Sequence, residues 1–260
     1  LEYLRTNGQG CEEYRHKKTG MELIYVPAGE FQMGSANGAD DEKPVHRVVL
    51  DGFLIGKHEV TNAQYRAFVK ATGGKDPPQA SDGYGYANYF SDPRYDEYPV
   101  VEVSWEDTKA YCDWAGVALP TEAQWEYAAR GKDGREYSWG NEAPDGKNGN
   151  VADRKARAVH SDWTSTLDVD DGYAFTSPVG AYVSHPSPVG AMDMSGNVWE
   201  WCADWYDEKY YAGCGDRMRN PPGPVGGSSR VVRGGSWGYY VAGLRGADRG
   251  WSGPGRWYFY

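Results

Sequence analysis

MSGNVWEWCADW at residues 194–205 and RVVRGGSW at residues 230–237 are the two segments that decide the fold. Four others precede them and complete a single order along the chain: GMELIYVPAGEFQMGS (20–35), KHEVTNAQYRAFV (57–69), YPVVEVSWEDTKAYCDWAG (98–116) and LPTEAQWEYAARG (119–131). Their residue patterns predict short strands first and three helices after them.

Apolar side chains alternate on both sides of Pro27-Ala28-Gly29, which predicts two strands joined by a turn. Residues 46–60, HRVVLDGFLIGKHEV, repeat this pattern around Asp51-Gly52. Because Asp-Gly is a preferred dipeptide of two-residue hairpin loops, we expect a hairpin there.

Three polar residues predict the starts of helices. Thr61 and Thr121 are each followed three residues later by glutamine, which is the pattern of a capping box. Ser104 is followed by two acidic residues in the first turn, where the helix dipole favours them. Gly73 suits the left-handed position at the end of the first helix, and Gly131 marks the end of the third.

Composition excludes some classes of protein. The formal net charge of -10 argues against a nucleic-acid partner, because phosphate contacts need clustered lysine and arginine. No apolar run approaches the length of a transmembrane segment, and residues 1–20 lack the apolar stretch of a signal peptide. The 11 tryptophans, 21 tyrosines and 35 glycines indicate many short strands and loops.

The four cysteines, Cys11, Cys112, Cys202 and Cys214, lack the CxxC spacing of zinc or redox sites. Cys202 and Cys214 either form a disulfide or remain thiols. Residues 137–180 show little periodicity, and a connection of this length needs packed aromatic side chains, an ion or a function to order it. No internal repeat separates two domains.

Together, the six segments resemble the formylglycine-generating enzyme (sulfatase-modifying factor) family from about residue 20 to the end. The resemblance implies an α+β protein with a C-type lectin fold and little regular secondary structure. We therefore expect an N-terminal extension over residues 1–19 and one domain over residues 20–260.

The enzymatic branch of this family oxidises a substrate cysteine, using two cysteines just after its Gly-Gly-Ser-aromatic motif to hold copper. Thiolates suit a soft copper ion. The corresponding positions here hold Tyr239 and, approximately, Leu244, and no cysteine follows Cys214. We therefore expect no copper and no catalytic activity of this kind, and we interpret the chain as a non-enzyme.

A second enzymatic branch joins sulfur to histidine derivatives at a non-haem iron, whose ligands come largely from a separate helical domain. Histidines are few here and show no ligand spacing such as HxxxH, so no iron is expected. We interpret all five as surface or hydrogen-bonded residues: His16, His46, His58, His160 and His185.

The tail, residues 238–260, resembles a third branch, the variable proteins of diversity-generating retroelements. In these proteins a reverse transcriptase rewrites adenines in one terminal stretch of the gene, chiefly at asparagine codons. The residues reachable by such changes, together with Trp251 as a framework aromatic, are the expected ligand-binding residues: Gly238, Tyr239, Tyr240, Ala242, Gly243, Asp248, Gly250, Trp251, Ser252, Gly253, Gly255, Trp257, Tyr258, Phe259 and Tyr260.

The composition of the tail favours binding without reference to any family. Tyrosine and tryptophan give a large contact area at low entropic cost, and glycine and serine give an adaptable backbone, as in antibody loops. Arg245, Arg249 and Arg256 either anchor the ligand or, for the first two, support the loop from behind. The alternatives are packed core aromatics in a structural module and an enzyme-like pocket near Trp237.

Enzymatic relatives in the family hold two calcium ions, and the resemblance maps their ligands onto this chain. Calcium prefers six to eight oxygen ligands, so mixed carboxylates and carbonyls are chemically suitable. The alternatives are an ordinary turn at Asp171 and an ion pair between Glu200 and Arg233. The first site comprises Asn150, Val151, Asp171 and Tyr173, and the second comprises Asp193, Gly196, Val198 and Glu200.

We therefore interpret the chain as a monomeric ligand-binding protein whose C-terminal surface recognises a protein or a cell-surface molecule, with a saccharide as the alternative. A location at the cell surface or outside the cell is favoured. Structural calcium is the one cofactor expected. The rival interpretation is a metal-dependent oxidase or sulfur-transfer enzyme of the same family with a centre that does not use cysteine.

Overall fold

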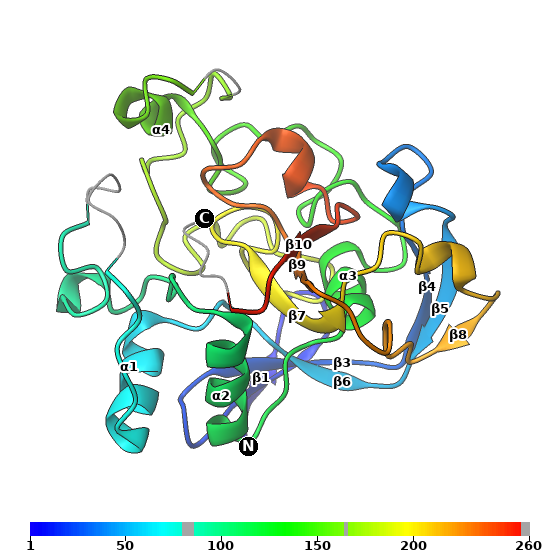
Figure 1. The fold of residues 1–260 in the computed structure, drawn as a ribbon, viewed down its shortest axis with the longest axis horizontal. Helices are drawn as coiled ribbons and strands as arrows, with labels where there is room; N and C mark the ends of the chain where they lie inside the picture. Colours follow the sequence, from blue (N-terminus) through cyan, green and yellow to red (C-terminus); the bar gives the residue numbers. More distant parts are fainter. Residues whose placement is uncertain (80–85, 164–165, 256–260) are drawn as a thin grey trace.

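The computed structural model describes residues 1–79, 86–163 and 166–255. Within these ranges the chain forms three small sheets and four α-helices, connected by long irregular segments (Figure 1). Four short 3₁₀-helices lie in these connections: η1 (Asp40–Glu42), η3 (Pro93–Tyr95), η4 (Tyr211–Gly213) and η5 (Val241–Leu244).

The first sheet contains four antiparallel strands in the order β1-β2-β3-β6. Its strands are β1 (Glu2–Thr6), β2 (Glu12–Arg15), β3 (Glu22–Val26) and β6 (Phe53–Gly56). Residues 1–19, which we treated as an extension, thus contribute two strands to this sheet.

The other two sheets have three strands each. One has the order β4-β5-β8, with β8 parallel to β5, and the other is antiparallel in the order β10-β9-β7. Their strands are β4 (Gly29–Met33), β5 (His46–Leu50), β7 (Glu200–Trp205), β8 (Met218–Arg219), β9 (Arg230–Arg233) and β10 (Gly250–Ser252).

The hairpin predicted at Asp51-Gly52 is wrong. β5 pairs with β4 and β6 pairs with β3, so the chain passes from one sheet to another at this dipeptide. A type I′ hairpin needs positive φ at both central residues, and neither Asp51 nor Gly52 has one. A Cβ atom at Gly52 would lie 2.5 Å from the hydroxyl of Tyr25, so the tyrosine ring packs directly over the glycine.

The three predicted helices are confirmed as α1 (Asn62–Thr72), α2 (Trp105–Ala115) and α3 (Glu122–Arg130), with N-caps at Thr61, Ser104 and Thr121. Each cap forms a capping box, including that of Ser104, which we had not identified. A fourth helix, α4 (Arg154–Val159), was not predicted, and Asp153 caps it. No helix within the described residues is long and apolar enough to cross a membrane.

Buried apolar side chains form two large clusters. The first lies between the sheets and α3, where Trp125, Ala128 and Ala129 are fully buried. The second lies between α1 and α2, where Tyr65 stacks on Tyr111 with ring centroids 5.7 Å apart. All four cysteines have free thiols, so Cys202 and Cys214 do not form a disulfide in this structure.

Candidate ligand-binding site

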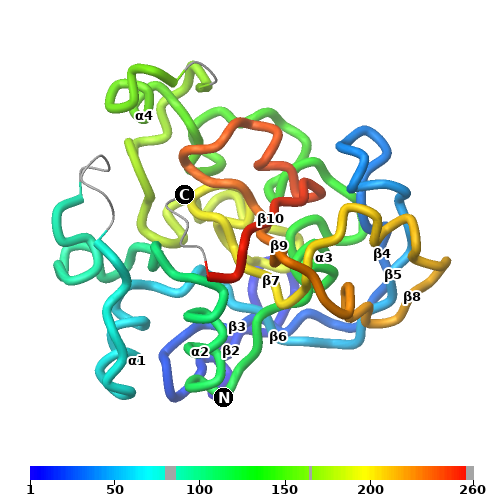
Figure 2. Tube along the Cα trace, in the orientation of Figure 1, coloured from blue at the N-terminus to red at the C-terminus, as the bar shows by residue number. Residues whose placement is uncertain are grey.

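The C-terminal segment leaves β9 and folds back over the sheet. Gly234 and Gly235 adopt positive φ angles of 95° and 70°, and a Cβ atom at Gly235 would lie 2.7 Å from the backbone oxygen of Gly243. The chain then passes through η5 and returns in β10, which pairs antiparallel with β9 (Figure 2). Residues 234–249 therefore form a loop whose base is closed by backbone contact.

Two arginines attach this loop to the protein from inside. Arg249 donates hydrogen bonds to both oxygens of the Glu122 carboxylate, at 2.8 and 3.0 Å, and its side chain is fully buried. Arg245 forms an ion pair with Glu42 and another, at 3.1 Å, with Glu136. Such charge-assisted pairs fix the orientation of the arginine side chains toward the protein interior. These arginines therefore hold the loop in place on its inner side rather than facing a ligand.

A third arginine binds the loop backbone directly. Arg233 is fully buried and donates hydrogen bonds to the carbonyl oxygens of Gly246 at 2.9 Å and Ala247 at 3.0 Å. Its guanidinium also forms an ion pair with the buried carboxylate of Glu126. The loop is therefore fixed to the β9 strand and to α3 by buried charged groups.

On its outer side the loop carries a pair of stacked tyrosines. The ring centroids of Tyr239 and Tyr240 lie 4.1 Å apart and their hydroxyl oxygens 2.7 Å apart. Trp199 meets Tyr239 edge to face at 5.1 Å. Tyr240 is 53% exposed. These three rings form an aromatic surface, and Trp199 comes from a segment that sequence analysis did not include in the site.

A second exposed aromatic pair lies at β10. Trp251 is 55% exposed and stacks on Tyr206, with ring centroids 5.9 Å apart. Tyr206 follows β7 and was also missed by the sequence analysis, because no local pattern relates it to the tail. We call the two pairs, together with Trp199, the aromatic face. Its five side chains are Trp199, Tyr206, Tyr239, Tyr240 and Trp251.

Two predicted ligand-binding residues do not face solvent. Gly243 is buried because the Tyr239 ring lies over it, so that a Cβ atom there would be 2.4 Å from the ring. Ser252 is 1% exposed because it lies in β10 opposite Arg230. We correct the prediction at these two positions. Both residues are buried beneath the surface and pack against the residues that form it.

The remaining predicted positions are partly or fully accessible. Tyr240, Ala242, Trp251 and Gly255 are exposed, whereas Gly238, Tyr239, Asp248, Gly250 and Gly253 are half-buried. Gly250 packs against Trp199, because a Cβ atom there would lie 2.8 Å from the indole ring. Outside the described residues lie Arg256, Trp257, Tyr258, Phe259 and Tyr260.

Neither residue at the expected thiol positions can replace a thiolate. Tyr239 belongs to the aromatic face, and Leu244 is completely buried in a cluster with Tyr137 and Val151. Trp237, beneath them, packs against other aromatic rings, including Phe175 at 5.3 Å and Trp163 at 5.6 Å.

Three carboxyl groups lie near enough for the charges of two to act on the third: Asp193 and Glu200 act on Glu59. Burial raises the pKa of Glu200 to about 7, with a further increase from the charge of Asp193. Burial also raises the pKa of Asp193 to about 6, and burial and both neighbours raise that of Glu59. Across the ranges that the structure describes, none of the three forms an ion pair with lysine or arginine.

This group includes both side chains predicted for the second calcium site. Glu200 lies opposite Arg233 in the sheet, but Arg233 pairs with Glu126, so the alternative ion pair with Glu200 does not form. Glu59 was missed, and its Oε1 is buried without a hydrogen-bond partner among the described residues. No three histidine, cysteine, aspartate or glutamate side chains in the described ranges converge on one metal position. Backbone carbonyls of Gly196 and Val198 would have to complete the set.

The first predicted calcium site is less open to an ion. Asp171 already accepts hydrogen bonds from the backbone of Val151 at 2.7 Å and Tyr173 at 2.8 Å. Burial nevertheless raises the pKa of Asp171 to about 7. Asn150 Oδ1 is buried and has no hydrogen-bond partner within the ranges that the structure describes.

Residues 10–257 match the sulfatase-modifying factor enzyme 1-like domain. The chain is 38% identical over 253 residues to the formylglycine-generating enzyme of Streptomyces coelicolor, covering 82% of this chain and 78% of that protein. PvdO of Pseudomonas aeruginosa superposes with a TM-score of 0.72 and 28% identity, over 94% of this chain and 93% of that one. Treponema denticola variable protein 1 superposes with a TM-score of 0.68 and 23% identity, over 96% of this chain and 95% of that one.

These likenesses confirm the α+β fold that the sequence predicted. They also contradict the prediction that the chain is not an enzyme, because the relative from Streptomyces coelicolor is named as an enzyme and aligns over most of the chain. The missing thiols at Tyr239 and Leu244 therefore do not remove the chain from a group that contains enzymes.

Proposed function

The chain belongs to the sulfatase-modifying factor family, and on that premise we propose that it binds a protein or cell-surface molecule through the aromatic face of its C-terminal segment. The observation that carries this proposal is the division of the tail into two sides. Leu244, Arg245 and Arg249 point into the protein, whereas Tyr240 and Trp251 are more than half exposed.

The exposed side has the chemistry of a recognition surface. Tyrosine and tryptophan are enriched among the residues that carry most of the binding energy in protein interfaces. Their rings are rigid, so ordering them on binding costs little entropy. Each aromatic pair contains a residue of the C-terminal segment, Tyr239 and Tyr240 in one and Trp251 in the other. A ligand that spans both pairs therefore suits this surface better than a small molecule. A saccharide is the alternative ligand, since sugar rings stack on exposed indole and phenol rings.

The same division allows the surface to vary without loss of the fold. Substitutions at Tyr240 or Ala242 should leave the ion pairs of Arg233, Arg245 and Arg249 intact, because the two substituted positions are exposed. This supports the interpretation of the tail as a diversified segment. Fold similarity to Treponema denticola variable protein 1 supplies a shared scaffold, and the residues of this chain carry the argument for binding.

The experiment that tests this proposal is to sequence the end of the gene in many cells of one population. We expect substitutions to concentrate at the exposed positions, such as Tyr240 and Ala242, while Leu244, Arg245 and Arg249 stay constant. An invariant tail would contradict diversification. A substitution pattern that spares the exposed positions and changes the buried ones would contradict the binding surface itself.

A second candidate function is oxidation of a substrate cysteine, as in the enzyme relatives, at a centre that does not use the two thiols. The identity of 38% to a formylglycine-generating enzyme favours it. Incubation of the protein with a cysteine-containing sulfatase peptide, under air and with copper or iron, tests it. Conversion of the cysteine to an aldehyde, seen as a mass change of the peptide, would establish the activity.

We also propose that calcium stabilises the protein at Asp193 and Glu200, with the carbonyl oxygens of Gly196 and Val198. Three half-buried acids without an ion pair to lysine or arginine are costly to ionise, and a divalent cation lowers that cost. The ion would fix the segment before β7, from which Trp199 projects to Tyr239. Asn150 and Asp171, with Val151 and Tyr173, are the candidates for a further calcium ion.

A further inference from the structure

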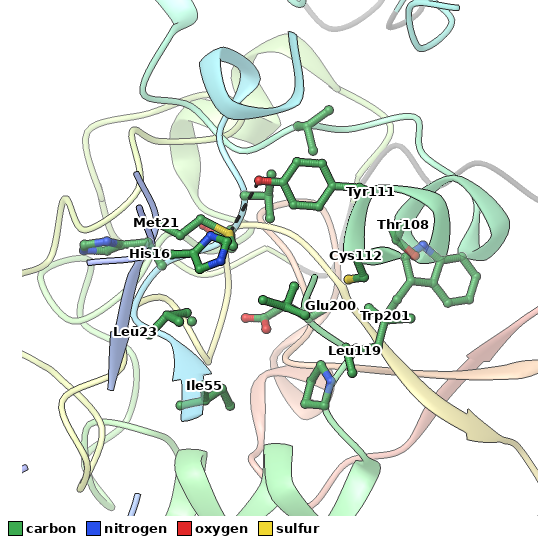
Figure 3. A pocket seen from close by; sticks show the side chains of 18 of the residues that line it. His16, Met21, Leu23, Ile55, Thr108, Tyr111, Cys112, Leu119, Glu200 and Trp201 are labelled. Atoms are coloured by element: carbon green, nitrogen blue, oxygen red, sulfur yellow. Dashed lines mark hydrogen bonds between the residues drawn. The ribbon is translucent and has the colours of Figure 1, made fainter. Parts of the chain in front are cut away.

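A cavity of about 620 Å³ lies between the two large hydrophobic clusters (Figure 3). Ile55 and Met194 line it from the first cluster, and Tyr65, Tyr111 and Cys112 line it from the second. A single domain normally has one contiguous core, and this volume falls within the range of small-molecule sites. The cavity is therefore large enough to hold a ligand.

Most of the cavity wall is apolar. Figure 3 shows the side chains of Met21, Leu23, Ile55 and Leu119 around the interior. They come from the N-terminal sheet, from the residue before β3 and from the segment between α2 and α3. An apolar wall gains free energy when an apolar group replaces the water beside it. The wall therefore suits the hydrocarbon part of a ligand.

One hydrogen-bond acceptor in this lining has an oxygen to spare. Glu59 lines the cavity, and its Oε2 accepts a hydrogen bond from the side-chain amide of Asn197 at 2.9 Å. The backbone amide of Val198 also approaches the carboxyl group, but Oε1 is buried and has no hydrogen-bond partner among the described residues. A buried acceptor without a donor costs free energy. A ligand that donates a hydrogen bond to Oε1 would remove this cost.

The surroundings of Glu59 favour a donor that carries a positive charge. Glu200 also lines the cavity, and Figure 3 shows its carboxyl group between Leu23 and Cys112. The charges of Asp193 and Glu200 act on Glu59, and the described part of the lining contains neither lysine nor arginine. Hydrogen bonds between two charged groups are about twice as strong as those between neutral ones. An ammonium group therefore gains more at this position than a hydroxyl group.

The proton of Glu59 does not prevent this pairing. Burial and the two neighbouring charges raise the pKa of Glu59, which favours the protonated acid in the empty cavity. A neutral amine that enters takes this proton, and the ammonium ion then formed beside the carboxylate lowers the pKa of Glu59 again.

We infer that this cavity binds a primary alkylamine as its ammonium ion, with the head group hydrogen-bonded to Oε1 of Glu59 and the alkyl chain along the apolar wall. Aromatic rings attract cations over their faces, and Tyr65, Trp199 and Trp201 also line the cavity. The site is separate from the aromatic face except at Trp199, which also contacts Tyr239.

Isothermal titration calorimetry of the purified chain at pH 7 tests this inference with octylamine, 1-octanol and octanoate, which share one chain length. EDTA is present so that no calcium at Asp193 and Glu200 competes with the amine. We expect octylamine to bind at least tenfold more tightly than 1-octanol, and octanoate to bind more weakly than either. Equal affinity for octylamine and 1-octanol, tighter binding of octanoate, or no binding of octylamine would overturn the inference.

Variants of Glu59 test the head-group contact. Glu59→Gln removes the charge at nearly constant size, so we expect octylamine to bind at least tenfold more weakly while the affinity for 1-octanol stays the same. Glu59→Asp keeps the charge and should retain more affinity for octylamine than Glu59→Gln. Glu97→Gln removes the same charge at an exposed position and should change nothing. Wild-type affinity for octylamine in Glu59→Gln would reject the contact.

Two further variants locate the alkyl chain. Leu119→Trp fills the cavity, and we expect it to weaken octylamine binding at least tenfold, whereas Val225→Trp adds the same ring at a fully exposed position and should change nothing. Leu119→Phe replaces the first variant if its circular dichroism shows misfolding. Retained affinity in a folded Leu119 variant would place the amine elsewhere and reject the cavity.

Discussion

Arg249 and Glu122 join the C-terminal segment to the first turn of α3 through two hydrogen bonds, 2.8 and 3.0 Å long, inside the protein. The guanidinium also lies 4.0 Å from the ring centroid of Tyr211. Because Arg249 immediately precedes β10, this pair fixes the position from which Trp251 projects. The position of Trp251 in the aromatic face thus depends on a contact inside the protein.

Replacing Arg249 with alanine should destabilise the protein strongly. The change leaves the buried carboxylate of Glu122 without this partner, and breaking a buried pair typically costs about 3–5 kcal/mol. For a chain of this size, that corresponds to a fall in Tm of roughly 6–20 °C, measured by thermal denaturation.

Arg94→Ala is the matched control, since the Arg94–Asp92 pair is exposed. Exposed pairs contribute about 1 kcal/mol or less, so its Tm should hardly change. Equal effects of the two substitutions would show that Arg249 does not anchor the loop.

Replacing Tyr240 with alanine should weaken ligand binding without loss of stability. The ring is 53% exposed and, among the described residues, stacks on its neighbour Tyr239 on the outer side. A tenfold loss of affinity, about 1.4 kcal/mol, is the minimum expected for a central aromatic contact. Binding to arrays of immobilised proteins and saccharides measures the effect.

Tyr3→Ala is the control for this experiment, because Tyr3 is 55% exposed on β1, outside the C-terminal segment. It removes the same side chain at nearly the same exposure. If both variants lose binding equally, the contact does not involve the aromatic face.

Local signals predicted the helices well. The capping boxes at Thr61 and Thr121 involve residues within one turn, so the sequence alone contains the whole interaction. The signal at Asp51-Gly52 is equally local, but strand pairing is not. β5 pairs with the distant β8, which no short pattern reveals, and the chain therefore leaves its sheet at the dipeptide where a hairpin was expected.

The same distinction explains the candidate site. The tail composition identified Tyr239, Tyr240 and Trp251, whose neighbours in sequence already indicated a surface. Trp199 and Tyr206 were missed because they reach this surface from β7 and its surroundings. Glu59 was missed for the same reason: it precedes α1, far along the chain from Asp193 and Glu200.

Stability should fall as pH rises, in part through Glu102. The residue is 1% exposed, its Oε1 has no hydrogen-bond partner in the described part of the chain, and burial raises the pKa of the carboxyl group from 4.5 to about 8. The folded protein therefore keeps a proton that the unfolded chain releases between these values. The stabilisation that this proton provides is complete below about pH 4.5 and is lost as pH rises through 8.

Glu102→Gln should remove this dependence. We expect the variant to match the wild type in free energy of unfolding at pH 5 and to exceed it at pH 9, measured by urea denaturation. Glu106→Gln, at an exposed position of the same segment, should leave the pH profile unchanged. A steeper fall of stability in the Glu102 variant would reverse the assignment.

Calcium should stabilise the protein at pH 8, where Asp193 and Glu200 are ionised. A ligand that binds only the folded state at a hundred times its Kd adds about 2.7 kcal/mol, which raises Tm by roughly 5–11 °C. We expect EDTA to abolish this shift and Asp193→Asn to remove most of it. Asp216→Asn, an exposed change with the same loss of charge, should retain the shift.

Terbium luminescence provides a second measurement. The Trp125 indole donates a hydrogen bond to Glu200, so it lies near enough to transfer energy to the bound ion. If calcium does not change the Tm, or if the Tm shift is the same in Asp193→Asn, then Asp193 and Glu200 hold protons rather than a metal.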